Sequence, residues 1–255
     1  MKSEEIKKAV RKTYGKVVLQ RTSCCGSEPL SKRSKAMGYS DKELQSVPEG
    51  ANLGLGCGNP VAIASLEPGQ VVLDLGSGAG FDCFLAAQKV GSEGRIIGVD
   101  MTPEMIDQSR RNAENGGYRN VEFRLGEIEH LPVADNQMDI VISNCVINLA
   151  SDKAQVLQEA YRVLKPGGRI AISDLALLKE LPAEIRENID AYTGCIGGAI
   201  LLEDYKKAVT AAGFKDVDYA FKTARDLVEA GIQATTDAEK ALAEYVVSVY
   251  ITGTK

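Results

Sequence analysis

Residues 71–80 read VVLDLGSGAG, a short apolar run that passes directly into a glycine-rich loop. The run VVLDL predicts a buried strand, and the following FDCFLAAQKV (81–90) predicts a helix. Glycines at such a junction let the backbone approach a ligand that a Cβ atom would exclude, at a helix N-terminus on the carboxyl edge of a sheet. The stretch therefore favours an α/β fold with a nucleotide-like ligand, although a tight strand-to-helix turn alone would leave the same pattern.

The pattern of this stretch repeats along the chain. Further strands are expected at 95–100, 121–125, 139–143 and 169–175, with helices at 103–115 and 153–164 between them. Alternation of this kind predicts a doubly wound, mostly parallel sheet, here seven-stranded. The last two strands, 214–221 and 245–254, lack a clear helix between them and are expected to close the sheet as an antiparallel pair.

The first 60 residues differ from the rest and are expected to form a separate arm before a domain at 61–255. Residues 1–16 predict a short basic helix that ends at Gly15. Residues 17–60 are rich in Ser, Gly and Pro, with a possible helical turn at SDKEL (40–44). Within the domain, residues 70–175 are expected to bind the ligand, and residues 176–255 to add substrate-side helices and the closing strands.

Composition excludes several classes of protein. Of the 255 residues, 44% are hydrophobic and 25% charged, and the net charge of −5 makes nucleic acid or an anionic membrane an improbable partner. No apolar run approaches the ~18 residues of a membrane span, and MKSEEIKKAV is too polar for a signal peptide. We therefore expect a cytoplasmic protein whose six cysteines are reduced.

The ligand loop is spaced GxGxG, with Asp74 two residues before its first glycine. An acidic group there suits a ligand with a positive amino group better than a pyrophosphate, and Asp100 at the end of the second strand suits a ribose diol. With the phrase LKPGGRIAISD (164–174), this set resembles the class I S-adenosylmethionine-dependent methyltransferases. The resemblance implies S-adenosylmethionine as cofactor, bound by Asp74, Gly76, Ser77, Gly78, Gly80, Asp100, Met101, Glu127, Ile128, Glu129 and Asn144.

The methyl acceptor is indicated by the thiols. The chain has one histidine, His130, so an acceptor that carries its own lone pair and needs no general base is favoured. Cys145 follows the fourth strand at the ligand edge, while Cys195 and Cys57 lie among glycines in YTGCIGGAI and NLGLGCGNP. This pattern fits thiolates that close on one soft ion. Cys83, inside a predicted helix, is interpreted as core.

The contexts of these cysteines, together with MGYSDKELQSVPEGANLGLGCGNP (37–60), resemble those of arsenite methyltransferases. The resemblance implies that Cys145 and Cys195 bind trivalent arsenic, and that Cys57 supplies a third thiolate or forms a disulfide with Cys24 or Cys25 after turnover. It also implies that thioredoxin or glutathione restores the thiols. Two alternatives stay open: a small-molecule C- or O-methyltransferase, and a metalloid-binding protein without turnover.

Overall fold

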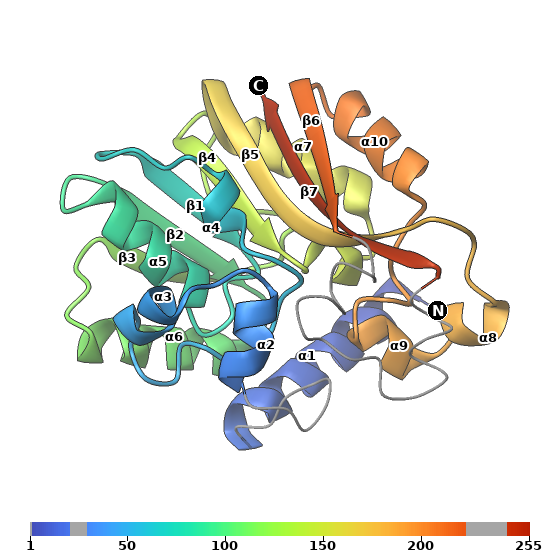
Figure 1. The fold of residues 1–255 in the computed structure, drawn as a ribbon, viewed down its shortest axis with the longest axis horizontal. Coiled ribbons are helices and arrows are strands. Elements are labelled where there is room, and N and C mark those ends of the chain that lie inside the picture. The colour runs from blue at the N-terminus through green and yellow to red at the C-terminus, as the bar shows by residue number, and fades with distance from the viewer. Residues whose placement is uncertain (1, 21–29, 223–243) are drawn as a thin grey trace.

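The computed structural model describes residues 2–20, 30–222 and 244–255, and its centre is one seven-stranded sheet (Figure 1). The strand order is β3-β2-β1-β4-β5-β7-β6, with β1 to β5 parallel and β7 antiparallel to both of its neighbours. This confirms the predicted fold and the antiparallel closing pair. The strands are β1 (Val71–Leu75), β2 (Arg95–Asp100), β3 (Val121–Leu125), β4 (Met138–Asn144), β5 (Leu164–Leu177), β6 (Lys215–Lys222) and β7 (Val246–Thr254).

Helices cover both faces because the central strands alternate buried apolar side chains between them. Val72, Ile96 and Ile142 pack on one face against α4 (Pro60–Ile63), α5 (Phe81–Val90) and α6 (Pro103–Asn115). Leu73 and Val141 point to the opposite face, which α7 (Lys153–Val163) and α10 (Leu202–Ala211) cover. Apolar side chains of the described helices cover both faces, which leaves the carboxyl edge of the sheet as the place for a ligand.

The strand order reverses at β1, which pairs with β2 on one side and β4 on the other. In open α/β sheets this switch point leaves a crevice outside the carboxyl ends of the strands. Gly76 follows β1 there, and Cys145 follows β4. The topology thus brings the glycine loop and the first substrate cysteine to the same crevice.

The arm is more helical than predicted. Its helices are α1 (Ser3–Gln20), α2 (Leu30–Ala36) and α3 (Asp41–Ser46), the last at the expected helical turn. The prediction that the first helix ends at Gly15 was wrong, because α1 runs through that residue. A Cβ atom at Gly15 would lie 3.1 Å from the Glu104 carboxylate of α6. The glycine therefore permits close packing of α1 on α6 rather than ending the helix.

The region after β5 also departs from the prediction. Of the substrate-side helices expected in 176–255, two are short, α8 (Ala183–Arg186) and α9 (Ile189–Thr193), and Asn188 caps the second through its side chain. Helix α10 was not predicted. In the described ranges, no helix has both the length and the apolar character needed to cross a membrane.

Candidate functional site

A cavity of about 300 Å³ opens at the carboxyl edge of the sheet. Its walls come from α1, the loop at 51–57, the glycine loop after β1, the ends of β2 and β4, and the segment 194–196. Gly76, Ser77, Gly78, Asp100 and Met101 all line it. Residues from the arm and from the domain therefore share one site.

The glycine loop is shaped for close approach. Gly76, Gly78 and Gly80 have φ values of 67°, 52° and 95°, in the left-handed region that favours glycine. A Cβ atom at Gly76 would collide with Val146 in the segment after β4. Asp100 holds the loop from below, since its Oδ2 accepts a hydrogen bond from Gly78 N at 3.0 Å and its Oδ1 accepts one from Thr102 N at 2.8 Å.

Three carboxylates from neighbouring elements line the cavity: those of Asp74 and Asp82 are buried, and that of Asp100 is half-buried. Burial raises the pKa of Asp100, raises that of Asp74 well above its usual range with help from the charge of Asp82, and raises that of Asp82 to about 6. The Cys83 thiol, buried as predicted, donates to Asp74 Oδ2 at 3.2 Å. A cationic ligand would relieve this concentration of negative charge, so the site fits a ligand with a sulfonium and an ammonium group.

The segment after β3 contributes less directly than predicted. Ile128 and Glu129 line the cavity, but the Glu127 carboxylate turns to α1, where it lies 2.6 Å from Lys7 Nζ. Glu129 lies 3.4 Å from the same ammonium group. These contacts fasten α1 over the cavity. The single histidine, His130, is exposed and lies outside the cavity lining.

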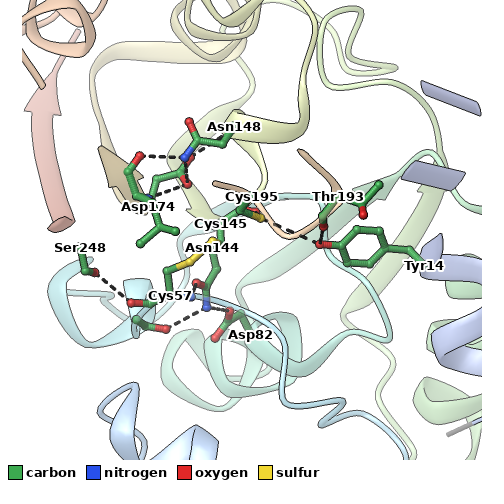
Figure 2. Close-up of a disulfide and its surroundings, with 12 residues drawn as sticks. Tyr14, Cys57, Asp82, Asn144, Cys145, Asn148, Asp174, Thr193, Cys195 and Ser248 are labelled. Atoms are coloured by element: carbon green, nitrogen blue, oxygen red, sulfur yellow. Dashed lines mark hydrogen bonds between the residues drawn. A yellow bond between two sulfur atoms is a disulfide. The ribbon is translucent and has the colours of Figure 1, made fainter. Parts of the chain in front are cut away.

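Three of the predicted cysteines come together beside the carboxylates. Cys57 and Cys145 form a disulfide with a Cα–Cα distance of 5.4 Å, which corrects the expectation that these two thiols are reduced. The partner of Cys57 here is therefore Cys145, whereas the resemblance implied that Cys57 supplies a third thiolate or pairs with Cys24 or Cys25. Those two residues lie outside the described part of the chain. Cys195 approaches from α9 and donates from Sγ to the Cys145 carbonyl at 3.1 Å (Figure 2).

The backbone at two of these cysteines is unusual. Cys145 has a φ of 55° and Cys195 a φ of 68°, a conformation that costs a non-glycine residue about 1–3 kcal/mol. Hydrogen bonds hold the first turn in place: Cys145 N donates to Ser173 O at 2.7 Å, and the Asn148 amide donates to Asp174 at 2.9 Å. The fold therefore maintains the strained turn that aims Cys145 at the cavity.

Apolar side chains surround the sulfur atoms. Ile6, Val10 and Tyr14 lie at intervals of four residues along α1, and they pack with the cysteines, Leu149 and Tyr192. The Tyr14 hydroxyl donates to Thr193 O at 3.1 Å and lies 3.9 Å from Cys195 Sγ (Figure 2). Helix α1 thus covers the thiols, and its side chains Ile6, Val10 and Tyr14 are called the roof below.

Asn144 lines the cavity, but its amide is already engaged with protein groups. Its Oδ1 accepts from Cys57 N at 2.9 Å, and its Nδ2 donates to Gly58 O at 2.9 Å and to Asp82 Oδ2 at 3.0 Å. The resemblance implied that Asn144 is among the cofactor residues. In this structure its hydrogen bonds tie the loop of Cys57 to the sheet.

In its present state the site is not a finished ligand set for a metal. No group of three or more His, Cys, Asp or Glu side chains in the described ranges has that arrangement. Two of the three converging sulfurs are bonded to each other, so a soft ion needs the disulfide to be reduced first.

Four residues that support the site were not singled out from the sequence: Tyr14, Tyr39, Asp82 and Ser248. They belong to no motif, and their hydrogen-bond partners lie far away in the sequence.

Comparisons with known proteins agree with this geometry. Residues 66–223 match the family described as "Methyltransferase domain". The chain is 46% identical to the arsenite methyltransferase of Halobacterium salinarum over 99% of its own length and 67% of that protein, and 39% identical to that of Aquipseudomonas alcaligenes over 82% and 62%. It spans 58–67% of the length of the five curated arsenite methyltransferases it matches. A crystal structure of an arsenic(III) S-adenosylmethionine methyltransferase from Chlamydomonas reinhardtii is 32% identical with a TM-score of 0.67, over 89% of this chain and 74% of that one.

Proposed function

Because this chain belongs to the arsenite methyltransferase family, we propose that it transfers the methyl group of S-adenosylmethionine to trivalent arsenic held by the thiolates of Cys57, Cys145 and Cys195. One observation carries the proposal. The three cysteines come from separate parts of the sequence, yet all line the cavity that the glycine loop and the buried carboxylates also line.

The carboxylate-lined part of the cavity suits the methyl donor. S-adenosylmethionine, when bound, supplies an electrophilic methyl group on a positively charged sulfur. Asp74 would face its amino group, Asp100 its ribose, and Gly76 to Gly80 would let its chain lie against the backbone. Met101, Ile128 and Glu129 would complete the wall around the base. The raised pKa values of Asp74 and Asp82 support this assignment, because they mark a site that gains from a bound cation.

The thiol-lined part suits the acceptor. Three thiols can displace the three hydroxyl groups of arsenous acid as three molecules of water, leaving arsenic pyramidal on three sulfurs. Thiolates select such a soft centre over hard ions. The arsenic lone pair, pointing away from the sulfurs, would attack the methyl carbon in line, and S-adenosylhomocysteine would leave with the electron pair of the broken C–S bond. No general base is needed, so position and orientation are the main contribution of the protein. The roof of Ile6, Val10 and Tyr14 limits the access of water.

The disulfide gives the chemistry its electron balance. Transfer of a methyl cation equivalent to the arsenic lone pair raises arsenic formally from the trivalent to the pentavalent state. Two thiolates that become a disulfide return two electrons to it. We interpret the Cys57–Cys145 disulfide as this oxidised form. A dithiol such as reduced thioredoxin, or two molecules of glutathione, would reduce the protein disulfide by thiol–disulfide exchange. The reductant would be oxidised to its own disulfide, and both cysteine thiols would be restored.

The direct test is incubation of the reduced protein with arsenite, S-adenosylmethionine and a dithiol, with speciation of the arsenic products. We expect methylated arsenicals in the complete mixture. No methylated arsenical should form when S-adenosylmethionine is left out, and none should form beyond the first turnover when the dithiol is left out. If the protein binds S-adenosylmethionine and its thiols are reduced but no methylarsenical forms, the proposal is wrong, and another acceptor or a binding role without turnover takes its place.

A further inference from the structure

The peptide at Cys57–Gly58 is fastened to two strands of the sheet by hydrogen bonds. Cys57 N donates to Asn144 Oδ1 at 2.9 Å and Gly58 O accepts from Asn144 Nδ2 at 2.9 Å, so one amide at the end of β4 binds the peptide groups before and after the Cys57–Gly58 bond. From β7, Ser248 Oγ donates to Cys57 O at 3.0 Å (Figure 2). The backbone N–H and C=O of Cys57 are therefore both bound to the sheet.

The glycines on either side of Cys57 allow this contact. A Cβ atom at Gly56 would lie 2.8 Å from Asn144 Nδ2 and Oδ1, and one at Gly58 would collide with Ser173 Oγ and the Tyr250 ring. Real Cβ atoms do not make such contacts, so a side chain at either position would lift the loop off the sheet. The loop can therefore pack on the sheet only with glycine on both sides of Cys57, and the sequence GCG also gives the backbone conformational freedom there.

Asn144 is itself held rigidly. Asp82 Oδ2 accepts from Asn144 Nδ2 at 3.0 Å, and Asp82 Oδ1 accepts from the Tyr39 hydroxyl at 2.6 Å. Tyr39 and Asp82 are both buried. Asn144 Oδ1 faces a backbone donor while Nδ2 faces acceptors, which fixes the orientation of the amide. A buried, fully engaged network of this kind holds one geometry.

From these contacts we propose that Ser248 and Asn144 are positioning residues for Cys57. They hold its backbone so that its Sγ stays beside Cys145 whether or not the disulfide is present. The consequence of this positioning, a preorganised arsenic site, rests on the proposed function. The positioning itself does not, because it can be measured on the protein without arsenic. Groups that orient a ligand residue through hydrogen bonds commonly change its affinity for a metal by about 10–100-fold.

The test measures the closeness of the two thiols without arsenic. Ser248→Ala and a matched control, Ser143→Ala, are made in a background in which Cys24 and Cys25 are serine. Ser143 is as deeply buried as Ser248, and its Oγ has no hydrogen-bond partner among the described residues. Each protein is equilibrated in glutathione buffers, where one oxidised glutathione and the two protein thiols exchange for the disulfide and two reduced glutathiones. The Cys57–Cys145 disulfide is then quantified by peptide mapping.

Loss of the Ser248 hydrogen bond leaves the carbonyl of the half-buried Cys57 without this donor. We therefore expect the equilibrium constant for the disulfide to fall about tenfold, or about 30 mV for a two-electron couple. Ser143→Ala should stay within twofold of the parent. Ser248→Thr, which keeps the hydroxyl, should recover most of the loss. An unchanged constant in Ser248→Ala, or an equal fall in Ser143→Ala, overturns the proposal.

The same variants connect the positioning to arsenic. Calorimetric titration should show arsenite binding weakened about tenfold in Ser248→Ala, with S-adenosylmethionine binding within twofold of the parent. Equal weakening of both ligands would mean a general structural defect and would contradict the proposal. A parent protein that binds no arsenite at all would refute the proposed function, while the glutathione equilibrium would still decide whether Ser248 positions Cys57.

Discussion

The two sides of the cavity differ in chemistry, because one is lined by carboxylates and the other by thiols. The carboxylate side, Asp74, Asp82 and Asp100, places charge that is costly to bury and that a bound cation would stabilise. The thiol side, Cys57, Cys145 and Cys195, places soft sulfur atoms among apolar side chains of α1 and α9. One side is suited to a charged donor and the other to a metalloid with little charge.

The two sides also differ in how the chain builds them. The carboxylate side comes from one continuous stretch, residues 74–100, in which β1, the first turn of α5 and the end of β2 carry the three groups in order. The thiol side gathers residues separated by 88 positions between Cys57 and Cys145, and then by the long excursion to Cys195. Local geometry fixes the first, whereas long-range hydrogen bonds must fix the second.

The largest effect expected on this comparison is that of Cys145→Ser. A hydroxyl is a poor donor to a soft centre, so arsenite methylation should fall more than about 100-fold. The dissociation constant of S-adenosylmethionine should stay within twofold of the parent, because the carboxylate side is untouched. Arsenic speciation and calorimetry measure the two quantities. Retained methylation would remove Cys145 from the thiol side.

Asp74→Asn probes the other side. Losing a buried charge that faces a cationic ligand should weaken S-adenosylmethionine binding by about 10–100-fold, the size of a charged hydrogen bond. Arsenite binding to the reduced protein should change less than twofold. If both affinities fell together in calorimetric titrations, the two sides would not be independent and the comparison would fail.

Acid should weaken the donor site selectively. The pKa of Asp82 is raised to about 6 in the protein without ligand, and a bound cation favours the ionised carboxylate. Protons and S-adenosylmethionine therefore compete, and the affinity should fall as the pH drops through 6, approaching about tenfold for each pH unit below it. Calorimetry between pH 5 and 8, a range on both sides of the Asp82 pKa of about 6, measures this change in S-adenosylmethionine affinity. Asp82→Asn should make the dependence less steep, and a pH-independent affinity would contradict the assignment.

The smallest effect concerns the roof that α1 forms over the thiol side. Lys7→Met removes the ion pair with Glu127 and leaves the buried Glu129 without its cation, which should lower the free energy of unfolding by about 1–2 kcal/mol. The exposed Lys8→Met is the matched control and should change it by less than about 0.5 kcal/mol. Urea denaturation measures both, and equal values for the two variants would show that Lys7 does not fasten the roof.

The sequence singled out Asp74 and Asp100 of the carboxylate side because their signals are local, but it did not single out Asp82 in α5. The run from Val71 to Gly80 determines a strand, a turn and a helix within one βα unit, and the strands of the core lie where the apolar runs indicated. The cysteines of the thiol side were also singled out, Cys145 by its place after a strand and Cys57 and Cys195 by their glycine neighbours. The residues that support them could not be, because the pattern of the strand that carries Ser248 does not indicate a contact with Cys57. Likewise, no local pattern around Gly15 indicates its close approach to Glu104 of α6.

The central claim is that Cys57, Cys145 and Cys195 together bind arsenic beside the donor site. X-ray absorption at the arsenic edge tests it most directly, on the reduced protein with Cys24 and Cys25 replaced by serine and loaded with one equivalent of arsenite. The account predicts three sulfur neighbours around arsenic, falling to two when Cys195→Ser is added. Fewer than three in the parent, or no change on adding Cys195→Ser, would contradict it.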